Sequence, residues 1–295
     1  MHSLTAFEAH LQSLDRSPAT VRGYLTDLTV FFRWLDVDDP NRLTAADIRG
    51  YRQHLIEQAA APQTVNRKLA AIAAFGNWAA QSGLLLANPA LNIKSVGTVP
   101  LAPKWLDKKQ RNALVQTMKD DLQKSRMRYP RLWLLRLRDA VTVVLMLNTG
   151  LRVSALCALR LNDLLISERK ATLTVRAGKG TKQRTLPLNK EARQMMEEWL
   201  DVRPQVNGDA VFIGQRGEKL QVRSVQNAVS RLAELAGLKE VTPHTCRHTF
   251  AKSLLDSGVS LEKVATLLGH ESLDTTRLYV TPGERDLELA VGVLD

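Results

Sequence analysis

The sequence predicts a mainly α-helical protein of two domains, with a small antiparallel β-sheet in the second domain. Three observations lead to this fold class. Apolar residues recur at helical spacing through most of the first hundred residues, and a stretch that contains prolines and lacks any period follows. Three short runs rich in Leu, Ile, Val and Thr then come close together between residues 163 and 188. With 295 residues, the chain is long enough for two ordinary domains.

Four helical patterns fill the N-terminal part of the chain. Each begins at a residue suited to a helix N-terminus: Ser3, Ser17 followed by proline, Thr44 with an acidic residue three positions later, and Pro62. The apolar residues on one face of each pattern can pack together, and no strand pattern competes with them. The sequence therefore predicts a small all-α domain over residues 1–95.

A connector is predicted over residues 96–103, because the chain after Asn88-Pro89 carries two further prolines and a glycine and loses its apolar period. Residues 104–295 then form the second domain. Its last part, from about residue 281, contains too many Leu and Val residues for an ordinary disordered end. This tail is expected to pack either on its own domain or on a neighbouring copy of the chain.

Charge and cysteine content point to a DNA- or RNA-binding protein of the cytoplasm. Lys and Arg number 41 against 30 Asp and Glu, which gives a net charge of +11. The first hundred residues are nearly neutral, so the excess lies in the second domain. This balance favours a nucleic acid over an acidic or neutral partner, although a merely basic protein is the alternative. Two cysteines, Cys157 and Cys246, do not make a disulfide framework.

Nothing in the sequence suggests secretion or a membrane span. The N-terminus has no cationic segment followed by an apolar core, so we expect no signal peptide. The longest apolar run, Ala140–Leu147, is far too short to cross a bilayer. A cytoplasmic protein without a membrane partner is therefore expected.

Three strands are predicted over Asp163–Ser167, Ala171–Ala177 and Gln183–Leu188, and the last two are joined by a Gly-Lys-Gly-Thr-Lys tip. This tip carries Lys179 and Lys182. Its composition predicts a flexible and basic tip, which in isolation is an ordinary solvent-exposed turn. Helices are predicted on both sides of the strands, from residue 105 to 119 and from residue 222 to 236.

Two basic features precede the strands. Six Lys and Arg residues lie between residues 124 and 138, either as a face toward a DNA backbone or as a solvated loop. Arg152 follows a buried apolar helix that ends at Asn148-Thr149-Gly150. In isolation, Arg152 is either a phosphate clamp or a partner in an ion pair at the edge of the core. Its planar guanidinium can meet two phosphate oxygens at once and keeps its charge.

The segment Thr242–Val280 carries the residues with the clearest chemistry. His244 and Arg247 are three positions apart near a predicted helix N-terminus, so both project from one face. His270 follows, and Tyr279 comes nine residues later. A phenol is a poor nucleophile at neutral pH because its pKa is about 10. Nearby cations and a base make it useful against a phosphate, so this set suits attack on a phosphodiester.

The ordered set His-x-x-Arg-His, Leu-Gly-His and Tyr resembles the C-terminal signature of the tyrosine recombinases, in particular the Xer-like branch and the short recombinases of mobile elements. Thr-Gly-Leu-Arg-Val-Ser around Arg152 resembles the first-arginine motif of the family. The resemblance implies an N-terminal four-helix SAM-like core-binding domain, which clamps DNA, and a C-terminal catalytic domain. The catalytic positions that it implies are Arg152, Lys179, His244, Arg247, His270 and Tyr279.

The resemblance also implies roles for these residues. The two arginines and His270 stabilise the phosphate, His244 accepts the proton of Tyr279, and Lys179 protonates the leaving 5′ oxygen. Tyr279 becomes a 3′-phosphotyrosine, without a metal, ATP or another cofactor. Less specific DNA-contact candidates are Arg67, Lys68, Lys182, Arg184, Arg223 and Arg231.

As a recombinase, the chain would bind paired double-stranded DNA sites as a homotetramer, or as a heterotetramer with a related recombinase, and pass through a Holliday junction near the nucleoid. Chromosome-dimer resolution, cointegrate resolution and integration or excision of a mobile element all stay open. So do a type IB topoisomerase and a DNA-binding accessory protein of weakened activity. One departure keeps the last alternative open, because Ala155 stands where the family usually has an acidic residue.

Metal chemistry is disfavoured. His244, Cys246 and His248 are the possible ligands, but Cys246 at the second position cannot share a helix face with both histidines. The glutamate of a His-Glu-x-x-His helix is also missing. We therefore expect no zinc site, and we expect Cys246 to pack in the core.

Overall fold

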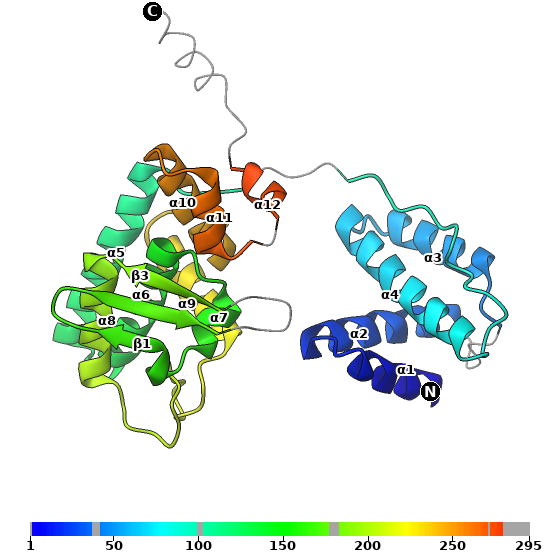
Figure 1. Cartoon of the computed structure of the whole chain (residues 1–295), viewed down its shortest axis with the longest axis horizontal. Helices are drawn as coiled ribbons and strands as arrows, with labels where there is room; N and C mark the ends of the chain where they lie inside the picture. The colour runs from blue at the N-terminus through cyan, green and yellow to red at the C-terminus, as the bar shows by residue number, and fades with distance from the viewer. Residues whose placement is uncertain (1, 37–41, 99–102, 177–182, 271, 280–295) are drawn as a thin grey trace, which may run out of the picture. The chain divides into compact units, whose positions relative to one another are not determined.

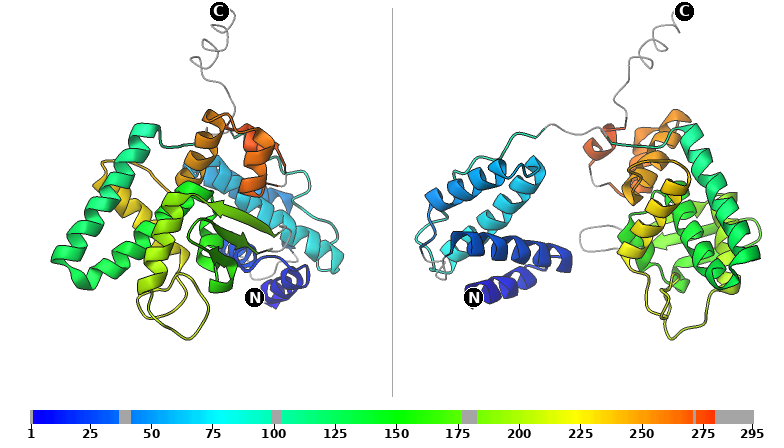
Figure 2. Two further views of the ribbon diagram at one scale, coloured as in Figure 1. Left: turned by 60° about the vertical axis from the view of Figure 1, so that its left-hand side comes forward. Right: turned by 180° about the vertical axis from the view of Figure 1, so that it is seen from behind.

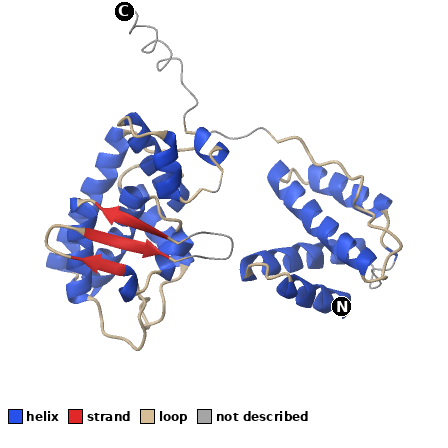
Figure 3. Ribbon diagram, viewed as in Figure 1, coloured by secondary structure: helices blue, strands red, loops and turns tan. Residues whose placement is uncertain are grey.

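In the computed structural model of the 295-residue chain, residues 2–36, 42–98, 103–176, 183–270 and 272–279 are described. The chain divides into two compact units, Met1–Leu101 and Ala102–Asp295. This division, between residues 101 and 102, falls within the connector predicted over residues 96–103. Helices make up most of both units, and the described strands lie in the second (Figure 3). None of the described helices combines the length and the apolar character that a bilayer crossing requires.

The described part of the first unit consists of α1 (His2–Ser13), α2 (Pro18–Leu35), α3 (Ala45–Glu57) and α4 (Pro62–Gln81), labelled in Figure 1. The predicted four-helix pattern is confirmed. Ser17 accepts a hydrogen bond from the backbone N–H of Thr20 (3.1 Å), and Thr44 forms the predicted capping box with Asp47. Buried aromatic rings fill the core between these helices, among them Phe7, Phe31, Tyr51 and Phe75.

The second unit is built around α6 (Pro130–Thr149), whose residues 140–147 are all buried. The preceding helix α5 (Lys108–Arg128) packs along it. The prediction of a helix from residue 105 to 119 is therefore shifted, because the side chain of Asp107 caps α5 by accepting a hydrogen bond from the N–H of Gln110 (2.8 Å). The basic residues between 124 and 138 lie on these two helices and not in a long loop.

The described strands form one antiparallel sheet in the order β1 (Leu164–Ile166), β2 (Ala171–Val175) and β3 (Arg184–Leu188). The predicted sheet is thus confirmed, with shorter strands. Leu173 of β2 pairs with Leu164 and Leu186 and is fully buried. The tip between β2 and β3, residues 177–182, lies outside the described residues, and so do Lys179 and Lys182.

Six further α-helices and the short 3-10 helix Leu161–Asp163 complete the described part of the second unit. The prediction assigns no element to residues 190–202, where Asn189 caps a helix that buries Met196 and Trp199. The final helices α10, α11 and α12 pack in sequence and lie together in all three views of Figures 1 and 2. The bounds are α7 (Val153–Ala158), α8 (Lys190–Val202), α9 (Val222–Leu235), α10 (Pro243–Asp256), α11 (Leu261–Leu268) and α12 (Asp274–Arg277).

Gly150 ends α6 at a point where a side chain does not fit. Its φ is +63°, and a Cβ atom there would lie 2.5 Å from Cδ1 of Phe250 and 2.7 Å from Cδ2 of Leu268. We expect Gly150→Ala to lower the free energy of unfolding by about 2–5 kcal/mol, since left-handed strain adds to overpacking. Urea unfolding measures this loss. Gly83→Ala is the matched control, because Gly83 has φ +76° but no atom within 4 Å of the added Cβ. It should cost only about 1–2 kcal/mol, and equal losses would contradict the packing argument.

Candidate active site

Two arginines are fixed at the C-terminal end of α11. Arg247 on α10 is buried (4% exposed), and its guanidinium donates hydrogen bonds to the carbonyls of Gly150 (2.6 Å) and Leu268 (2.8 Å). Arg184 on β3 donates through Nε to the carbonyl of Leu267 (3.2 Å). The last carbonyls of a helix are free acceptors at the negative end of its dipole, so they attract cations. The fold therefore positions both guanidinium groups without help from a ligand.

Arg152 completes a cluster of three guanidinium groups, here called the arginine cluster. It is the N-cap residue of α7. Burial is the larger cause and the charge of Arg152 the next cause that lowers the pKa of Arg184 and that of Arg247, the latter to about 10. Among the described residues, no carboxylate pairs with the arginine cluster, and the guanidinium of Arg152 has no hydrogen-bond partner. Three positive charges that lie together with no acid among the described residues favour an anion, and planar guanidinium groups suit phosphate in particular.

His270 lies beside the arginine cluster as a neutral hydrogen-bond donor. Its Nδ1 is 2.7 Å from Oγ1 of Thr276, a fully buried residue on α12. Because this hydroxyl has no other acceptor among the described residues, we infer that it donates to Nδ1 and leaves the hydrogen of His270 on Nε2. Burial lowers the pKa of His270 to about 4, helped by the three guanidinium groups and His248. Sequence reasoning missed Thr276, for which no motif gives a role.

Tyr279 follows α12 and is 5% exposed, with its ring packed against Ala251, Val264 and Leu268. Its Oη lies 2.5 Å from Nδ1 of His248 on α10. Burial raises the pKa of Tyr279, although Arg247 and Arg152 act in the opposite direction. The hydroxyl is therefore protonated in the free chain, and the imidazole of His248 is its hydrogen-bond partner.

The pKa of His248 is lowered to about 4 by burial first and then by His244 and Arg247. The depressed values of His248 and His270 predict an acid-sensitive fold. Below pH 6.5 the unfolded chain gains protons on these two histidines that the folded chain does not take up until about pH 4. Stability is therefore complete above pH 6.5 and falls as the pH drops toward 4, by up to about 1.4 kcal/mol per pH unit for each histidine.

Urea unfolding at a series of pH values between 7 and 4 measures this slope. A chain with both His248→Gln and His270→Gln should show a flatter dependence over the same range. An unchanged slope in that double variant would show that other groups cause the acid sensitivity.

The structure links most of the predicted catalytic residues but not all of them. His244 is exposed on the first turn of α10, and its ring centroid is 6.4 Å from that of His248. Among the described residues, the hydroxyl of Tyr279 contacts His248 and not His244. Sequence reasoning gave no role to His248, although it stands next to Arg247 in the motif. Contacts or electrostatic interactions connect Arg152, Arg247, His270 and Tyr279.

Two residues of the motif segments have packing roles. Ala155 is half-buried against the core and supplies no carboxylate, so the two backbone carbonyls orient Arg247. Cys246 is fully buried in the core, as predicted, and burial raises the pKa of its thiol to about 12. Burial also raises the pKa of Cys157, to about 11. Both thiols are therefore protonated at neutral pH.

Two of the DNA-contact candidates are held by an acid inside the first unit. Asp27 is 3% exposed and forms ion pairs with Arg67 and with Lys68, whose Nζ lies 3.6 Å from Oδ1. The side chain of Lys68 is only 14% exposed and lies 3.4 Å from the hydroxyl of Tyr51. A buried carboxylate 41 positions earlier therefore draws Lys68 inward, so this candidate does not lie on an outer helix face that is free for DNA. Arg67 is 53% exposed.

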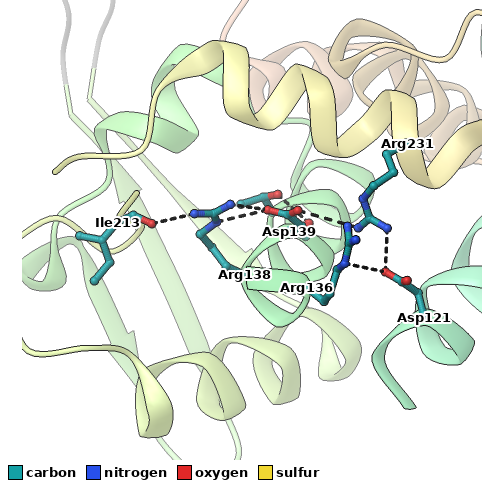
Figure 4. Close-up of polar contacts among 7 residues, drawn as sticks. Asp121, Arg136, Arg138, Asp139, Ile213 and Arg231 are labelled. Atoms are coloured by element: carbon teal, nitrogen blue, oxygen red, sulfur yellow. Dashed lines mark hydrogen bonds and ion pairs between the residues drawn. The ribbon is translucent and has the colours of Figure 1, made fainter. Parts of the chain in front are cut away.

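Arg231 is bound within the second unit, as Figure 4 shows. Its guanidinium lies 2.9 Å from Oδ2 of Asp121 and 3.8 Å from Oδ2 of Asp139. Arg138, in the basic stretch, is buried and donates to Asp139 and to the carbonyl of Ile213. The two alternatives predicted for residues 124–138 were a face toward a DNA backbone and a solvated loop. Arg138 fits neither of them, because its buried guanidinium is bound inside the protein. Arg223 on α9 is exposed.

Comparison with known proteins covers both units. The model of the phage integrase family matches residues 104–285, and that of the phage integrase N-terminal SAM-like domain matches residues 4–83. Tyrosine recombinase XerC of Corynebacterium glutamicum is 32% identical over 269 residues, 90% of this chain and 82% of the relative. XerC of Thermodesulfovibrio yellowstonii is 33% identical over 94% of this chain and 90% of its own length. XerD of Listeria monocytogenes is 30% identical over 95% and 94%.

Solved structures share the fold. The XerH site-specific recombinase bound to palindromic difH substrate, in a post-cleavage complex, aligns with a TM-score of 0.73 and 20% identity over 97% of this chain and 84% of that chain. A lambda integrase (75–356) dimer bound to a COC′ core site aligns with a TM-score of 0.73 and 18% identity over 97% and 96%.

Proposed function

We propose, given that this chain belongs to the phage integrase family and is a site-specific recombinase of the tyrosine type, that it cuts and rejoins DNA through a 3′-phosphotyrosine intermediate. The observation that carries the proposal is a buried phenol, Tyr279, in the electrostatic field of Arg247 and Arg152. Such cations stabilise both the phenolate and the charge that gathers on the phosphate in the transition state.

Each residue of the site has a step to perform. Arg152 and Arg247 neutralise the two non-bridging oxygens of the scissile phosphate. His270 donates a hydrogen bond from Nε2, since Thr276 occupies its Nδ1. Lys179, which lies outside the described residues, protonates the leaving oxygen. His244, exposed on the first turn of α10 with its ring centroid 6.4 Å from that of His248, adds a further contact to the phosphate.

The bonds balance without an external energy source. The Oη of Tyr279 forms a bond to phosphorus as the bond to the 5′ oxygen breaks, and that oxygen leaves as a hydroxyl. The new phosphodiester between Tyr279 and the 3′ end keeps the bond energy. A 5′ hydroxyl can therefore attack it in the reverse reaction and rejoin the strand without ATP.

Covalent capture tests the proposal. The chain is incubated with synthetic duplexes of randomised sequence, each carrying a nick that lets the short 5′ fragment diffuse away after cleavage. We expect adducts that survive sodium dodecyl sulfate and disappear with protease, and sequencing of the trapped duplexes yields a preferred site. A chain that binds DNA but gives no adduct with any duplex would be an accessory protein.

A plasmid that lacks the selected site separates a recombinase from a type IB topoisomerase. We expect no relaxation of this plasmid, because a recombinase needs its site on both partners. A plasmid with two copies of the site should instead recombine. Efficient relaxation of the plasmid without a site would favour the topoisomerase.

Strand exchange on paired sites, through a Holliday junction, requires several copies of the chain. The second unit holds a cavity of about 880 Å³ that is lined in part by Leu147, Phe250 and Leu254. The apolar tail from about residue 281 of a neighbouring copy is the occupant that we propose for it, in a closed tetramer. Native mass spectrometry of the chain on two synapsed sites counts the copies, with a chain ending at residue 281 as the comparison.

Contacts outside the active site would supply affinity. The first unit would clamp DNA through Arg67, after release from Asp27, and the second through Arg223. Arg184, as part of the arginine cluster, would meet the DNA backbone at the active site itself. Lys68 and Arg231 stay candidates, but each must first leave its acidic partner. Lys182 also stays a candidate and lies outside the described residues.

A further inference from the structure

The contact between His248 and Tyr279 has no role in the reaction as described so far. His248 is the residue directly after Arg247, on the part of α10 that faces the end of α12. Its Nδ1 lies 2.5 Å from the phenolic oxygen, and the two ring centroids are 5.3 Å apart. The ring of Tyr279 is enclosed by apolar side chains of α10 and α11, so the hydroxyl has His248 as its polar partner among the described residues.

The protonation states follow from the surroundings. His248 faces His244 and Arg247 on its own helix, His270 at the end of α11, and Tyr279 after α12; Arg152 acts on the last two. Burial, followed by His244 and Arg247, keeps the imidazole neutral at pH 7. Burial also keeps the phenol protonated, against the opposing effect of Arg247 and Arg152. A phenol is a far stronger acid than a neutral imidazole, so its O–H donates to Nδ1 and the imidazole carries its hydrogen on Nε2.

We propose, resting on the proposed function, that His248 is the proton acceptor for the hydroxyl of Tyr279 during DNA cleavage and returns the proton on rejoining. The O–H bond of Tyr279 breaks as an N–H bond forms at Nδ1 of His248. The phenolic oxygen then bonds to phosphorus, and the 5′ oxygen leaves with a proton from the general acid. In the reverse step the 5′ hydroxyl attacks, and the departing phenolate takes its proton back from His248.

Geometry favours His248 over His244 for this step. A general base must lie within hydrogen-bond reach of the proton that it removes. His248 does so, whereas among the described residues His244 is exposed one turn earlier and makes no contact with Tyr279. His244 is free to meet the phosphate instead.

Bound phosphate would also switch this base on. In the free chain, burial first, then His244, and then the field of Arg247 oppose a positive charge on His248. A phosphate anion on the arginine cluster offsets that field, so proton transfer becomes easier when the scissile phosphate is in place. The nucleophile is thereby kept protonated until DNA arrives.

The test uses the full-length chain and the selected nicked duplex in single-turnover capture. His248→Gln keeps a hydrogen-bond acceptor for Tyr279 but cannot take up its proton, so we expect adduct formation to slow by about 10²–10⁴-fold. His248→Ala should be slowed similarly and then rescued by added imidazole, in proportion to the free-base fraction of the imidazole. His244→Gln is the matched variant, and its loss should not respond to imidazole in the corresponding His244→Ala chain.

A second readout follows the acidity of the nucleophile. Fluorination of the ring of Tyr279 lowers the pKa of its hydroxyl and reduces the need for a base. We expect 3-fluorotyrosine at position 279 to recover part of the loss in His248→Gln but none of the loss in His244→Gln. A purely structural role for His248 would give neither the imidazole response nor this recovery.

The proposal is overturned if His248→Gln captures DNA at the parental rate, or if imidazole rescues His244→Ala and not His248→Ala. Nuclear magnetic resonance of ¹⁵N-histidine in the unaltered chain provides a measurement that needs no variant of His248. A protonated Nδ1 on His248 at pH 7 would also overturn it. Absence of any adduct from the parental chain would instead defeat the proposed function.

Discussion

Replacement of Tyr279 by Phe is expected to abolish covalent capture of the selected nicked duplex, with adduct formation below detection. Only one oxygen is removed, so the ring can keep its packing against Ala251, Val264 and Leu268. DNA affinity and the thermal midpoint should therefore change little. Both are measured beside the capture assay, by fluorescence anisotropy on the same duplex and by thermal unfolding.

Tyr129→Phe is the matched control for this expectation. Tyr129 lies in the same unit, between α5 and α6, and is 59% exposed, so its hydroxyl has no part in the site. Capture by this variant should equal that of the parental chain. A protease-sensitive adduct in Tyr279→Phe would mean that another residue attacks the phosphate, and the proposed chemistry would then be abandoned.

Local sequence signals predicted the first unit well. The side chains of Ser17 and Thr44 cap helices by bonding backbone N–H groups only three positions later, so these caps are visible in the local sequence. The apolar face of each helix is equally visible from its spacing, whichever helix it packs against. The three strands were recognisable for the same reason. Residues 190–202 carried similar signals, with a cap at Asn189 and buried Met196 and Trp199 at helical spacing, so α8 could have been predicted and was not.

Side-chain partners distant in sequence were beyond such signals. Lys68 turns inward because of Asp27, and Arg231 is bound by Asp121, 110 positions away. Nothing in a single sequence shows which acids meet which cations after folding. The motif grouped Arg152, Arg247, His270 and Tyr279 by their specific order along the chain, and electrostatic interactions connect them in the structure, while their catalytic roles stay predictions. It could not reveal that Thr276 sets the hydrogen of His270, or that the hydroxyl of Tyr279 meets His248.

The two arginines predicted to hold the phosphate differ in their contacts with the fold. Arg247 is buried and satisfies two backbone carbonyls, whereas Arg152 has no hydrogen-bond partner among the described residues. Burial lowers the pKa of Arg184 and that of Arg247, and repulsion by Arg152 lowers both further. The arginine cluster therefore lowers the stability of the DNA-free chain, and a bound anion would restore that stability. Such a loss is typical of preorganised sites.

This difference predicts that Arg152→Ala and Arg247→Ala lose similar activity but differ in stability. Each should slow covalent capture by about 10²–10³-fold, the loss expected for one donor to a developing oxyanion. Only Arg247→Ala should unfold more easily, by about 2–5 kcal/mol, because two buried carbonyls lose their partner. Arg152→Ala should be as stable as the parental chain or slightly more so, since it relieves like-charge repulsion.

Capture rates and urea unfolding of the same preparations provide the comparison, and Arg247→Lys serves if Arg247→Ala does not fold. The lysine keeps the charge but cannot span both carbonyls, so it should show an intermediate stability and most of the rate loss. A large stability loss in Arg152→Ala would mean that its guanidinium supports the fold. A parental capture rate in that variant would remove Arg152 from the phosphate site, and the phosphate would then have to rest on Arg247 and Arg184 alone.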